Sequence, residues 1–298
     1  MFGQPLAKAA PPAVVAWSPS GSFNYGTHPP GASASQTFTL SNTDHKNVAV
    51  SVSLTGAAAF SKTTDNCTGT SLSRGKSCTV IVAYAAASGT SNATLTATTS
   101  RGPVSVNLTG TSTWQSGDLT TYGQIEWRGD GTAGTLLLAD YNSVYAAGSD
   151  LFFIGLPNTG YFEQFDSAQA LKNYFPQSGS PGPLTSSLVD PTTSPSGAFG
   201  GDVASLKLNV DLYDAGDISG NSGLKVGDLA ICGLTSDTDL NGKSVRQFLD
   251  ITNTALGGGS TTDSITDLDT IAQSVSASFD LGDPSTWAQA HLVNGSCP

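Results

Sequence analysis

The stretch Val48-Ala49-Val50-Ser51-Val52-Ser53-Leu54 places an apolar residue at every second position. A second stretch, Cys78-Thr79-Val80-Ile81-Val82-Ala83-Tyr84, keeps an apolar side chain at each alternate position in the same way. Successive side chains of a β-strand point to opposite faces, so each stretch offers one apolar face to a core. The two stretches therefore predict half-buried strands.

The same alternation extends outward over the first third of the chain. Dipeptides that favour turns, such as Ser20-Gly21 and Arg101-Gly102, separate about seven short strands between residues 13 and 112. Half-buried strands at this spacing predict an antiparallel β-sandwich. The further strand runs are Val14–Trp17, Thr37–Ser41, Ala93–Ala97 and Val104–Leu108.

Composition narrows the class of protein. The 298 residues carry a net charge of −11, and 38% of them are hydrophobic while only 12% are charged. Such an acidic chain is repelled by nucleic acid and by anionic lipid, and its apolar content suffices for packed cores. Because no run of 18 apolar residues occurs, we expect no membrane span.

Four cysteines, Cys67, Cys78, Cys232 and Cys297, fall as one pair in each half of the chain. No C-x-x-C motif or His/Cys cluster accompanies them, which argues against zinc. Two disulfides formed in an oxidising compartment are the preferred interpretation. We therefore expect an extracellular location, on a cell surface or on a virion.

Residues 1–12 form an arm rich in Pro and Ala, which we expect a neighbouring subunit to hold. Pro11-Pro12 interrupts the apolar run of this arm, so we expect no signal peptide there. The intact Met1 and the missing export signal favour a virion protein, which leaves its cell at lysis.

The first third resembles the choice-of-anchor D family, immunoglobulin-like domains of bacterial surface proteins related to the ASH/HYDIN group. This resemblance covers residues 13–112 and implies an immunoglobulin-like sandwich, a Cys67–Cys78 disulfide between neighbouring strands and no catalytic residues. The residues that carry it are Phe23–Gly26, Thr37–Asn42, Phe60, Cys67–Leu72, Gly75–Val80 and Val106–Gly110.

After a linker at 113–117, the pattern over residues 118–298 changes to that of a mixed α+β domain with about three to four helices. Predicted strands lie at Thr135–Ala139, Leu151–Ile154, Leu206–Leu212 and Asp228–Cys232. Predicted helices run from a cap at Asp166 or Ser167 to Phe175, over Asn241–Leu256, from a cap at Asp263 or Ser264 to Phe279, and around Trp287 and His291.

This second half resembles an uncharacterised module near the C-termini of large secreted bacterial proteins. The resemblance implies a cell-surface or extracellular setting and brings no activity with it. The family often has a cysteine near its start, where this chain has Thr120-Thr121, and that departure leaves Cys232 and Cys297 as partners. The matching residues are Gly182–Leu188, Pro191–Ser194, Gly197–Gly201, Leu206–Val210, Leu240–Gly242, Val245 and Leu256–Gly259.

Two acidic loops are candidate calcium sites, and we expect no other cofactor. Asp237, Asp239 and Asn241 match the opening of a calcium loop, but its twelfth position is Phe248 instead of Glu. An Asx turn before a helix cap is therefore the preferred interpretation. The second acidic loop follows an apolar run, and a solvated loop without bound calcium is the preferred interpretation of it. Its members are Asp211, Asp214 and Asp217.

Three aromatic residues, Trp114, Tyr122 and Trp127, cluster near the junction of the two halves. Exposed aromatic rings bind sugars by stacking on their flat faces, which makes these residues candidates for ligand binding. The preferred interpretation is that they pack the junction.

The sequence offers no catalytic constellation. It contains no G-x-S-x-G motif, phosphate loop or dinucleotide fingerprint, and no pair of carboxylates stands out by spacing. We therefore expect a non-enzymatic structural or adhesive subunit of a bacterial surface filament or layer, or of a phage appendage or decoration. A carbohydrate-binding module is the alternative, and a secreted hydrolase the third. Expected partners are further copies of the chain, contacted through the arm, and a host or cell-surface polymer.

Overall fold

The computed structural model describes residues 14–86, 89–146 and 151–297, and the predicted arm at 1–12 lies outside them. The chain divides into two compact units. Unit 1 comprises Met1–His28 and Ala32–Ser112, and unit 2 comprises Pro29–Gly31 and Thr113–Pro298. Residues 113–117, predicted as a linker, thus belong to unit 2.

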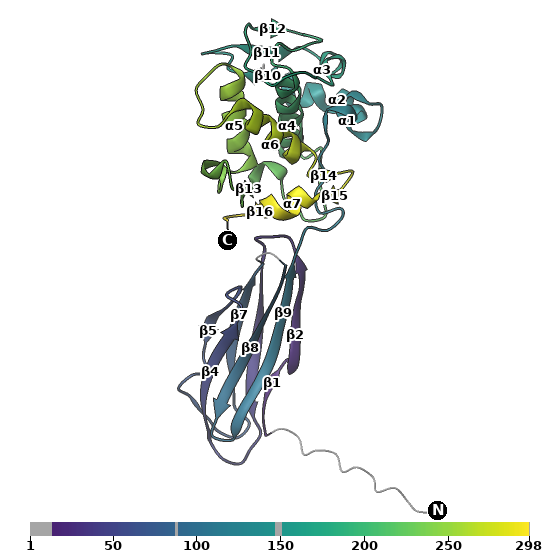
Figure 1. Cartoon of the computed structure of the whole chain (residues 1–298). Helices are drawn as coiled ribbons and strands as arrows, with labels where there is room; N and C mark the ends of the chain where they lie inside the picture. The colour runs from purple at the N-terminus through teal and green to yellow at the C-terminus, as the bar shows by residue number, and fades with distance from the viewer. Residues whose placement is uncertain (1–13, 87–88, 147–150, 298) are drawn as a thin grey trace, which may run out of the picture. The chain divides into compact units, whose positions relative to one another are not determined.

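Unit 1 is the predicted immunoglobulin-like β-sandwich (Figure 1). One sheet has the strand order β1-β3-β7-β5, and the other has the order β2-β9-β8-β4-β6. The strands are β1 (Val15–Ser18), β2 (Gly21–His28), β3 (Ser33–Asn42), β4 (Val48–Gly56), β5 (Phe60–Asp65), β6 (Ser71–Leu72), β7 (Ser77–Ala85), β8 (Gly89–Thr99) and β9 (Gly102–Ser112).

The core of unit 1 consists of the alternate residues that the sequence pattern selects. Val80, Val82 and Tyr84 of β7 are fully buried, as are Leu95 of β8 and Phe38 of β3. Burying such side chains contributes roughly 1.5–3 kcal/mol each, so this interior stabilises the pairing of the two sheets.

One pairing differs from the prediction of an antiparallel sandwich, because β2 pairs with β9 in parallel. The chain leaves the first sheet after β1, crosses at Pro19 and Ser20, and joins the edge of the second sheet as β2. Alternation of apolar residues reports which face of a strand is buried and carries no information about the direction of its neighbour.

Unit 2 is the predicted α+β domain, with helices packed around α4 (Figure 1). The helices are α1 (Gln124–Arg128), α2 (Thr132–Tyr141), α3 (Ala168–Tyr174), α4 (Ala198–Ala215), α5 (Val245–Leu256), α6 (Ile265–Ser276) and α7 (Thr286–His291). A short π-helix covers Asn142–Ala146, and short 3₁₀-helices cover Val226–Asp228 and Thr238–Leu240. The strands are β10 (Phe152–Gly155), β11 (Phe162–Phe165), β12 (Leu188–Val189), β13 (Leu229–Ile231), β14 (Phe279–Asp280), β15 (Asp283–Pro284) and β16 (Leu292–Asn294).

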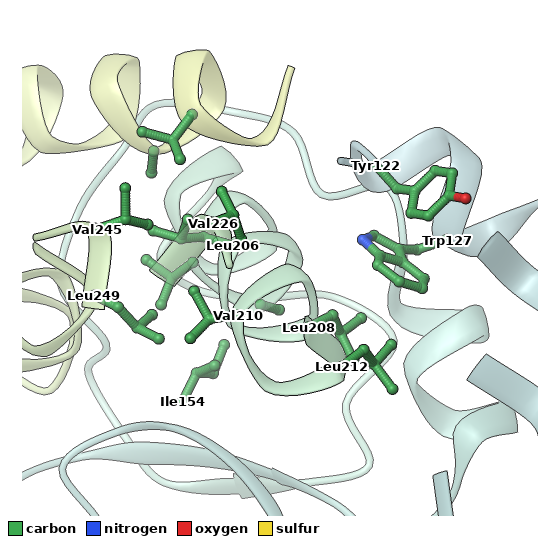
Figure 2. Packing of buried hydrophobic residues seen from close by; sticks show 14 of the residues in the cluster. Tyr122, Trp127, Ile154, Leu206, Leu208, Val210, Leu212, Val226, Val245 and Leu249 are labelled. Atoms are coloured by element: carbon green, nitrogen blue, oxygen red, sulfur yellow. The ribbon is translucent and has the colours of Figure 1, made fainter. Parts of the chain in front are cut away.

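The predicted strand at Leu206–Leu212 is wrong, because these residues form the middle of α4. Figure 2 shows Val210 on one side of this helix and Leu208 and Leu212 on the other. A helix buried all round shows no apolar stripe, so a short apolar run in it cannot be told from a buried strand. The predicted strand at Thr135–Ala139 is wrong too, since these residues lie in α2. The described residues therefore hold seven α-helices instead of three to four.

The amphipathic helices were predicted correctly as helices, but α6 ends at Ser276, and Phe279, the predicted end of this helix, lies in β14. Ser167 caps α3 by accepting a hydrogen bond from the backbone N–H of Ala170, and Ser264 caps α6 in the same way through Asp267. Helix α5 begins at Val245, four residues later than predicted, and Ser244 is its cap. The apolar stripes of α5 and α6 face α4, which is why the three- and four-residue spacing identified these two helices.

Candidate functional site

The outward positions of β2, β9, β8 and β4 form one continuous surface of unit 1, which we call the uncharged face. These strands alternate buried and more exposed residues, and among the described residues no outward position on them is charged. Nearly all of its side chains end in a hydroxyl or a carboxamide. The members are Ser22, Asn24, Thr27, Ala49, Ser51, Ser53, Thr55, Thr90, Asn92, Thr94, Thr96, Thr98, Pro103, Ser105, Asn107, Thr109 and Thr111.

Hydrogen bonds between β8 and β9 hold several of these side chains in place. Thr109 donates to the Oδ1 of Asn92 at 3.0 Å, and the hydroxyls of Thr96 and Ser105 lie 2.9 Å apart. These residues are direct neighbours in the antiparallel register. Each such cross-strand pair stabilises the sheet by a few tenths of a kcal/mol and limits the rotamers of the face.

A shallow hollow of about 470 Å³ lies in the middle of the uncharged face. Gly56, at the end of β4, lies beside it and approaches β8 closely: a Cβ there would come within 2.6 Å of the Ala93 Cα. The φ of Gly56 is 128°, a region that favours glycine. The walls of the hollow are Thr55, Asn92, Thr94, Asn107 and Thr109.

Charged residues of unit 1 lie elsewhere, as in the ion pair that Lys62 and Asp65 form on β5 at 2.7 Å. Burial alone would raise the pKa of Asp65, but hydrogen bonds from Lys62, Thr68 and the backbone of Cys67 hold this pKa well below its usual range. The same contacts order the chain just before Cys67.

Both predicted disulfides are present in the structure. Cys67–Cys78 joins the end of the β5 segment to β7 across a separation of 11 residues. Cys232–Cys297 joins the residue after β13 to the segment after β16, with a separation of 65 residues. Each unit therefore has one covalent cross-link of its own.

The aromatic candidates for ligand binding are buried in the core of unit 2. Trp114, Tyr122 and Trp127 are 1%, 7% and 0% exposed. Trp114 donates its Nε1–H to the carbonyl of Leu292 at 3.0 Å, and Tyr122 meets Trp127 edge to face. None of the three offers an open ring face to a sugar, so their prediction as a stacking platform is corrected to a packing role within unit 2.

The first calcium candidate loop has the contacts of a turn. The side-chain amide of Asn241 donates to the carbonyl of Leu234, and its oxygen accepts from the Leu234 N–H, both at 2.9 Å. Asp239 accepts from the hydroxyl of Thr262. Burial, followed by the charges of Asp267 and Asp239, raises the pKa of Asp237. Calcium at this loop stays a prediction.

The aspartates of the second calcium candidate have separate partners. Asp211 accepts hydrogen bonds from Lys207 at 2.7 Å and from the hydroxyl of Tyr145 at 2.9 Å. Asp214 pairs with Arg246, and the Oδ2 of Asp217 is buried without a partner among the described residues. Over the described ranges no three His, Cys, Asp or Glu side chains gather as a metal-holding group. Calcium stays a prediction here as well.

The three histidine rings contact backbone carbonyls or an arginine, and within the described residues none hydrogen-bonds to a Ser, Thr or Cys side chain that could act as a nucleophile. His28 and His291 bind the carbonyls of Tyr25 and Cys232, both at 2.8 Å, and His45 contacts Arg74.

In the part of the chain that is described, no helix has the length and hydrophobicity needed to cross a bilayer.

Sequence reasoning did not identify the uncharged face as a candidate site. Its signal is the run Thr90, Asn92, Thr94, Thr96 and Thr98, in which every residue opposite the apolar set carries a hydroxyl or a carboxamide. Ordinary solvent-facing strands show the same alternation with mixed charges, so the pattern becomes informative once the register places four such strands side by side.

No protein-family model matches the chain, and neither does any curated protein. Among similar solved structures, the VesB protease of Vibrio cholerae is 25% identical over 33% of this chain and 32% of that chain, with a TM-score of 0.28. The ASH/PapD-like domain of human CEP192 is 16% identical over 38% and 96% of the two chains, with a TM-score of 0.29. The MSP-domain-like protein SSP-19 of Caenorhabditis elegans is 13% identical over 33% and 99%, with a TM-score of 0.27.

This chain spans 32% of VesB and 24% of VesC, a secreted serine protease of the same bacterium. At these TM-scores the similarities carry no argument about what this chain does.

Proposed function

We propose that the chain is a non-enzymatic attachment subunit of an extracellular assembly, and that its uncharged face binds neutral polysaccharide. The observation that carries the proposal is the uniform chemistry of this face in a chain with a net charge of −11. Neutral sugars present dense hydroxyl donors and acceptors, which the Ser, Thr and Asn side chains match without the cost of desolvating a charge.

The composition of the face favours a polysaccharide over a protein partner. Tight protein interfaces centre on Trp, Tyr and Arg anchors, and none of these occupies an outward position of the four strands within the described residues. Hydrogen bonds that replace those with water contribute only about 1 kcal/mol each. Binding would therefore depend on many hydrogen bonds along one polymer. Several copies of the chain in an assembly would bind the same polymer at once and so raise the overall affinity.

The remaining features support an attachment role over catalysis. A disulfide in each unit suits an oxidising compartment, and the histidines are engaged with backbone or arginine. Membership of the choice-of-anchor D group belongs to the same proposal, as does a place in a surface filament or layer or in a phage appendage. Self-association through the arm would supply the multiple copies.

The test compares Thr94→Lys, at the hollow, with Thr37→Lys, an exposed position on β3 of the other sheet. Both variants add the same charge to a threonine of a strand. The full chain and both variants are applied to an array of neutral and acidic glycans, and circular dichroism checks their fold. We expect binding to neutral glycans, a loss of at least about tenfold in Thr94→Lys, and none in Thr37→Lys.

Two outcomes would count against the proposal. The wild-type chain could bind none of the neutral glycans, or Thr94→Lys could bind as well as Thr37→Lys. Preferential binding to acidic glycans would also contradict it, since the face carries no positive charge.

A further inference from the structure

A cavity of about 310 Å³ opens in unit 2, between α1, α4, the end of α6 and the loop after α3. No Lys, Arg or His is among the residues that line it. Its lining combines carboxyl, carboxamide and hydroxyl groups with an apolar edge. The polar residues are Gln124, Glu126, Gln177, Asp202, Gln273 and Ser276, and the apolar ones are Ile125, Pro176 and Ala277.

Asp202 of α4 is the buried anion of this cavity and is only 5% exposed. Gln124 donates its Nε2–H to the Oδ1 of Asp202 at 2.7 Å, while the Oε1 of Gln124 accepts from the backbone N–H of Gln177 at 2.7 Å. Gln124 is therefore fixed from two sides, and it holds the carboxyl group of Asp202 in one orientation.

One polar atom in the lining of the cavity has no partner among the described residues. Ser276 lines the cavity, is 2% exposed, and its hydroxyl makes no hydrogen bond. Asp269 of α6, by contrast, shares a hydrogen bond with Asp202 and needs no ligand. A buried polar atom without a partner costs about 1–3 kcal/mol, so a ligand that bonds to the Ser276 hydroxyl would recover that cost.

The shape and chemistry of the cavity argue against a single metal ion. Within the described residues its carboxyl groups do not gather as a set of three metal ligands. The same lining includes apolar residues, among them Ile125, which is 71% exposed. An elongated ligand with a cation at one end and an aliphatic stem fits both parts, because such stems lie along apolar surface while the head stays with polar groups.

We propose that this cavity binds the terminal cation of an aliphatic chain, with the ammonium or guanidinium group at Asp202 and the stem along Ile125 and Pro176. A lysine or arginine side chain of a peptide and a free polyamine share this chemistry. Three features support it: the carboxyl groups of Asp202 and Glu126, the unpaired hydroxyl of Ser276, and a lining without any cation.

The charges that face Asp202 predict a dependence on pH. Asp269 of α6 shares a hydrogen bond with Asp202, Glu126 of α1 lines the same cavity, and the Asp202 charge also acts on Tyr174 of α3. Burial, and then the charge and hydrogen bond of Asp269, raise the pKa of Asp202 to about 7. Asp202 thus gains its full charge above neutral pH, where a cationic ligand should bind best.

Isothermal titration of the full chain tests the proposal with four probes: Nα-acetyl-arginine amide, Nα-acetyl-lysine amide, spermidine, and the uncharged isostere Nα-acetyl-citrulline amide. At pH 8 the arginine probe should bind at least about tenfold more tightly than citrulline, and its affinity should fall severalfold at pH 5.5. Tighter binding of spermidine than of the amino acid amides would assign the ligand to polyamines, and the reverse would assign it to a peptide.

Asp202→Asn should weaken binding of the arginine probe at least about tenfold. The matched control, Asp250→Asn, removes a carboxylate from an exposed position of α5 outside the cavity and should leave binding unchanged. Equal affinity for arginine and citrulline would overturn the proposal. So would full binding by Asp202→Asn, or no heat from any probe up to about 10 mM, which corresponds to less than about 3 kcal/mol of binding free energy. The glycan test concerns unit 1 alone, so either proposal can fail without the other.

Discussion

Replacing Asp202 by Asn should make unit 2 more stable above neutral pH, because it removes a buried charge while keeping the volume of the side chain. In the folded protein, burial and the neighbouring Asp269 raise the pKa of Asp202 to about 7, against an ordinary value of 3.8. The folded state therefore holds the proton of Asp202 more tightly than the unfolded chain does. Its contribution to stability is complete below about pH 4 and is lost as the pH rises through about 7.

The magnitude follows from the difference between the two pKa values. About 3 pKa units at 1.36 kcal/mol each correspond to about 4 kcal/mol of unfolding free energy lost between pH 4 and pH 8. Asparagine carries no charge at any of these pH values and can still accept from Gln124. The variant should therefore match the wild-type chain near pH 4 and exceed its stability by up to about 4 kcal/mol at pH 8.

The full chain is unfolded in urea at pH 4, 6 and 8. Hydrogen exchange of peptides from α4 and α6 is the readout, because it reports the unfolding of unit 2 separately from that of unit 1. Asp250→Asn is the control for removing one negative charge and should change stability by less than about 0.5 kcal/mol at each pH. The reasoning would be refuted if Asp202→Asn kept the pH dependence of the wild-type chain, or if it were less stable than wild type at pH 8.

Three further predictions concern the rest of the chain. Asp65→Asn should destabilise unit 1 by about 1 kcal/mol at pH 7, because the low pKa of Asp65 depends on its contacts with Lys62 and Thr68. It should also reduce the loss of stability that we expect for unit 1 below about pH 4. Urea midpoints measured across this pH range check the prediction, and the same loss in variant and wild type would refute it. Replacing both members of Cys67–Cys78 by Ala should lower the free energy of unfolding by about 3 kcal/mol, and the same change at Cys232–Cys297 should lower it by about 4 kcal/mol, because the second disulfide closes the longer loop. A larger loss for Cys67–Cys78 in denaturant unfolding would contradict this. Glu163, whose pKa is raised mainly by burial, accepts a hydrogen bond from the hydroxyl of Tyr174 at 2.7 Å. Glu163→Gln keeps an acceptor and should leave the melting temperature nearly unchanged, whereas Glu163→Ala should lower it. Equal melting temperatures for the two variants would count against this.

Sequence reasoning worked where one face of an element is buried. The alternation over Val48–Leu54 and the stripe on α6 each mark a boundary between core and solvent, and both elements were predicted correctly. It failed at α4, where Phe199, Leu206 and Leu212 are all fully buried on a helix that is covered on most of its surface.

The candidate sites were harder to predict, since each depends on the pairing of distant segments. Thr94 and Asn107 become neighbours only through the register of β8 and β9. Asp202 and Gln124 are separated by 78 residues, and their contact requires α1 to pack against α4. The cysteine pairs were predicted because the resemblance to a known family implied Cys67–Cys78 and left Cys232 and Cys297 as partners.

Backbone amide shifts of the full chain, recorded by nuclear magnetic resonance during titration with a neutral oligosaccharide, test the attachment role most directly. We predict that the shifted amides lie on β8 and β9 around Asn92, Thr94 and Asn107, with those of β3 and β7 unchanged. Shifts confined to unit 2 or to β3 and β7, or none at all with neutral sugars, would contradict the account.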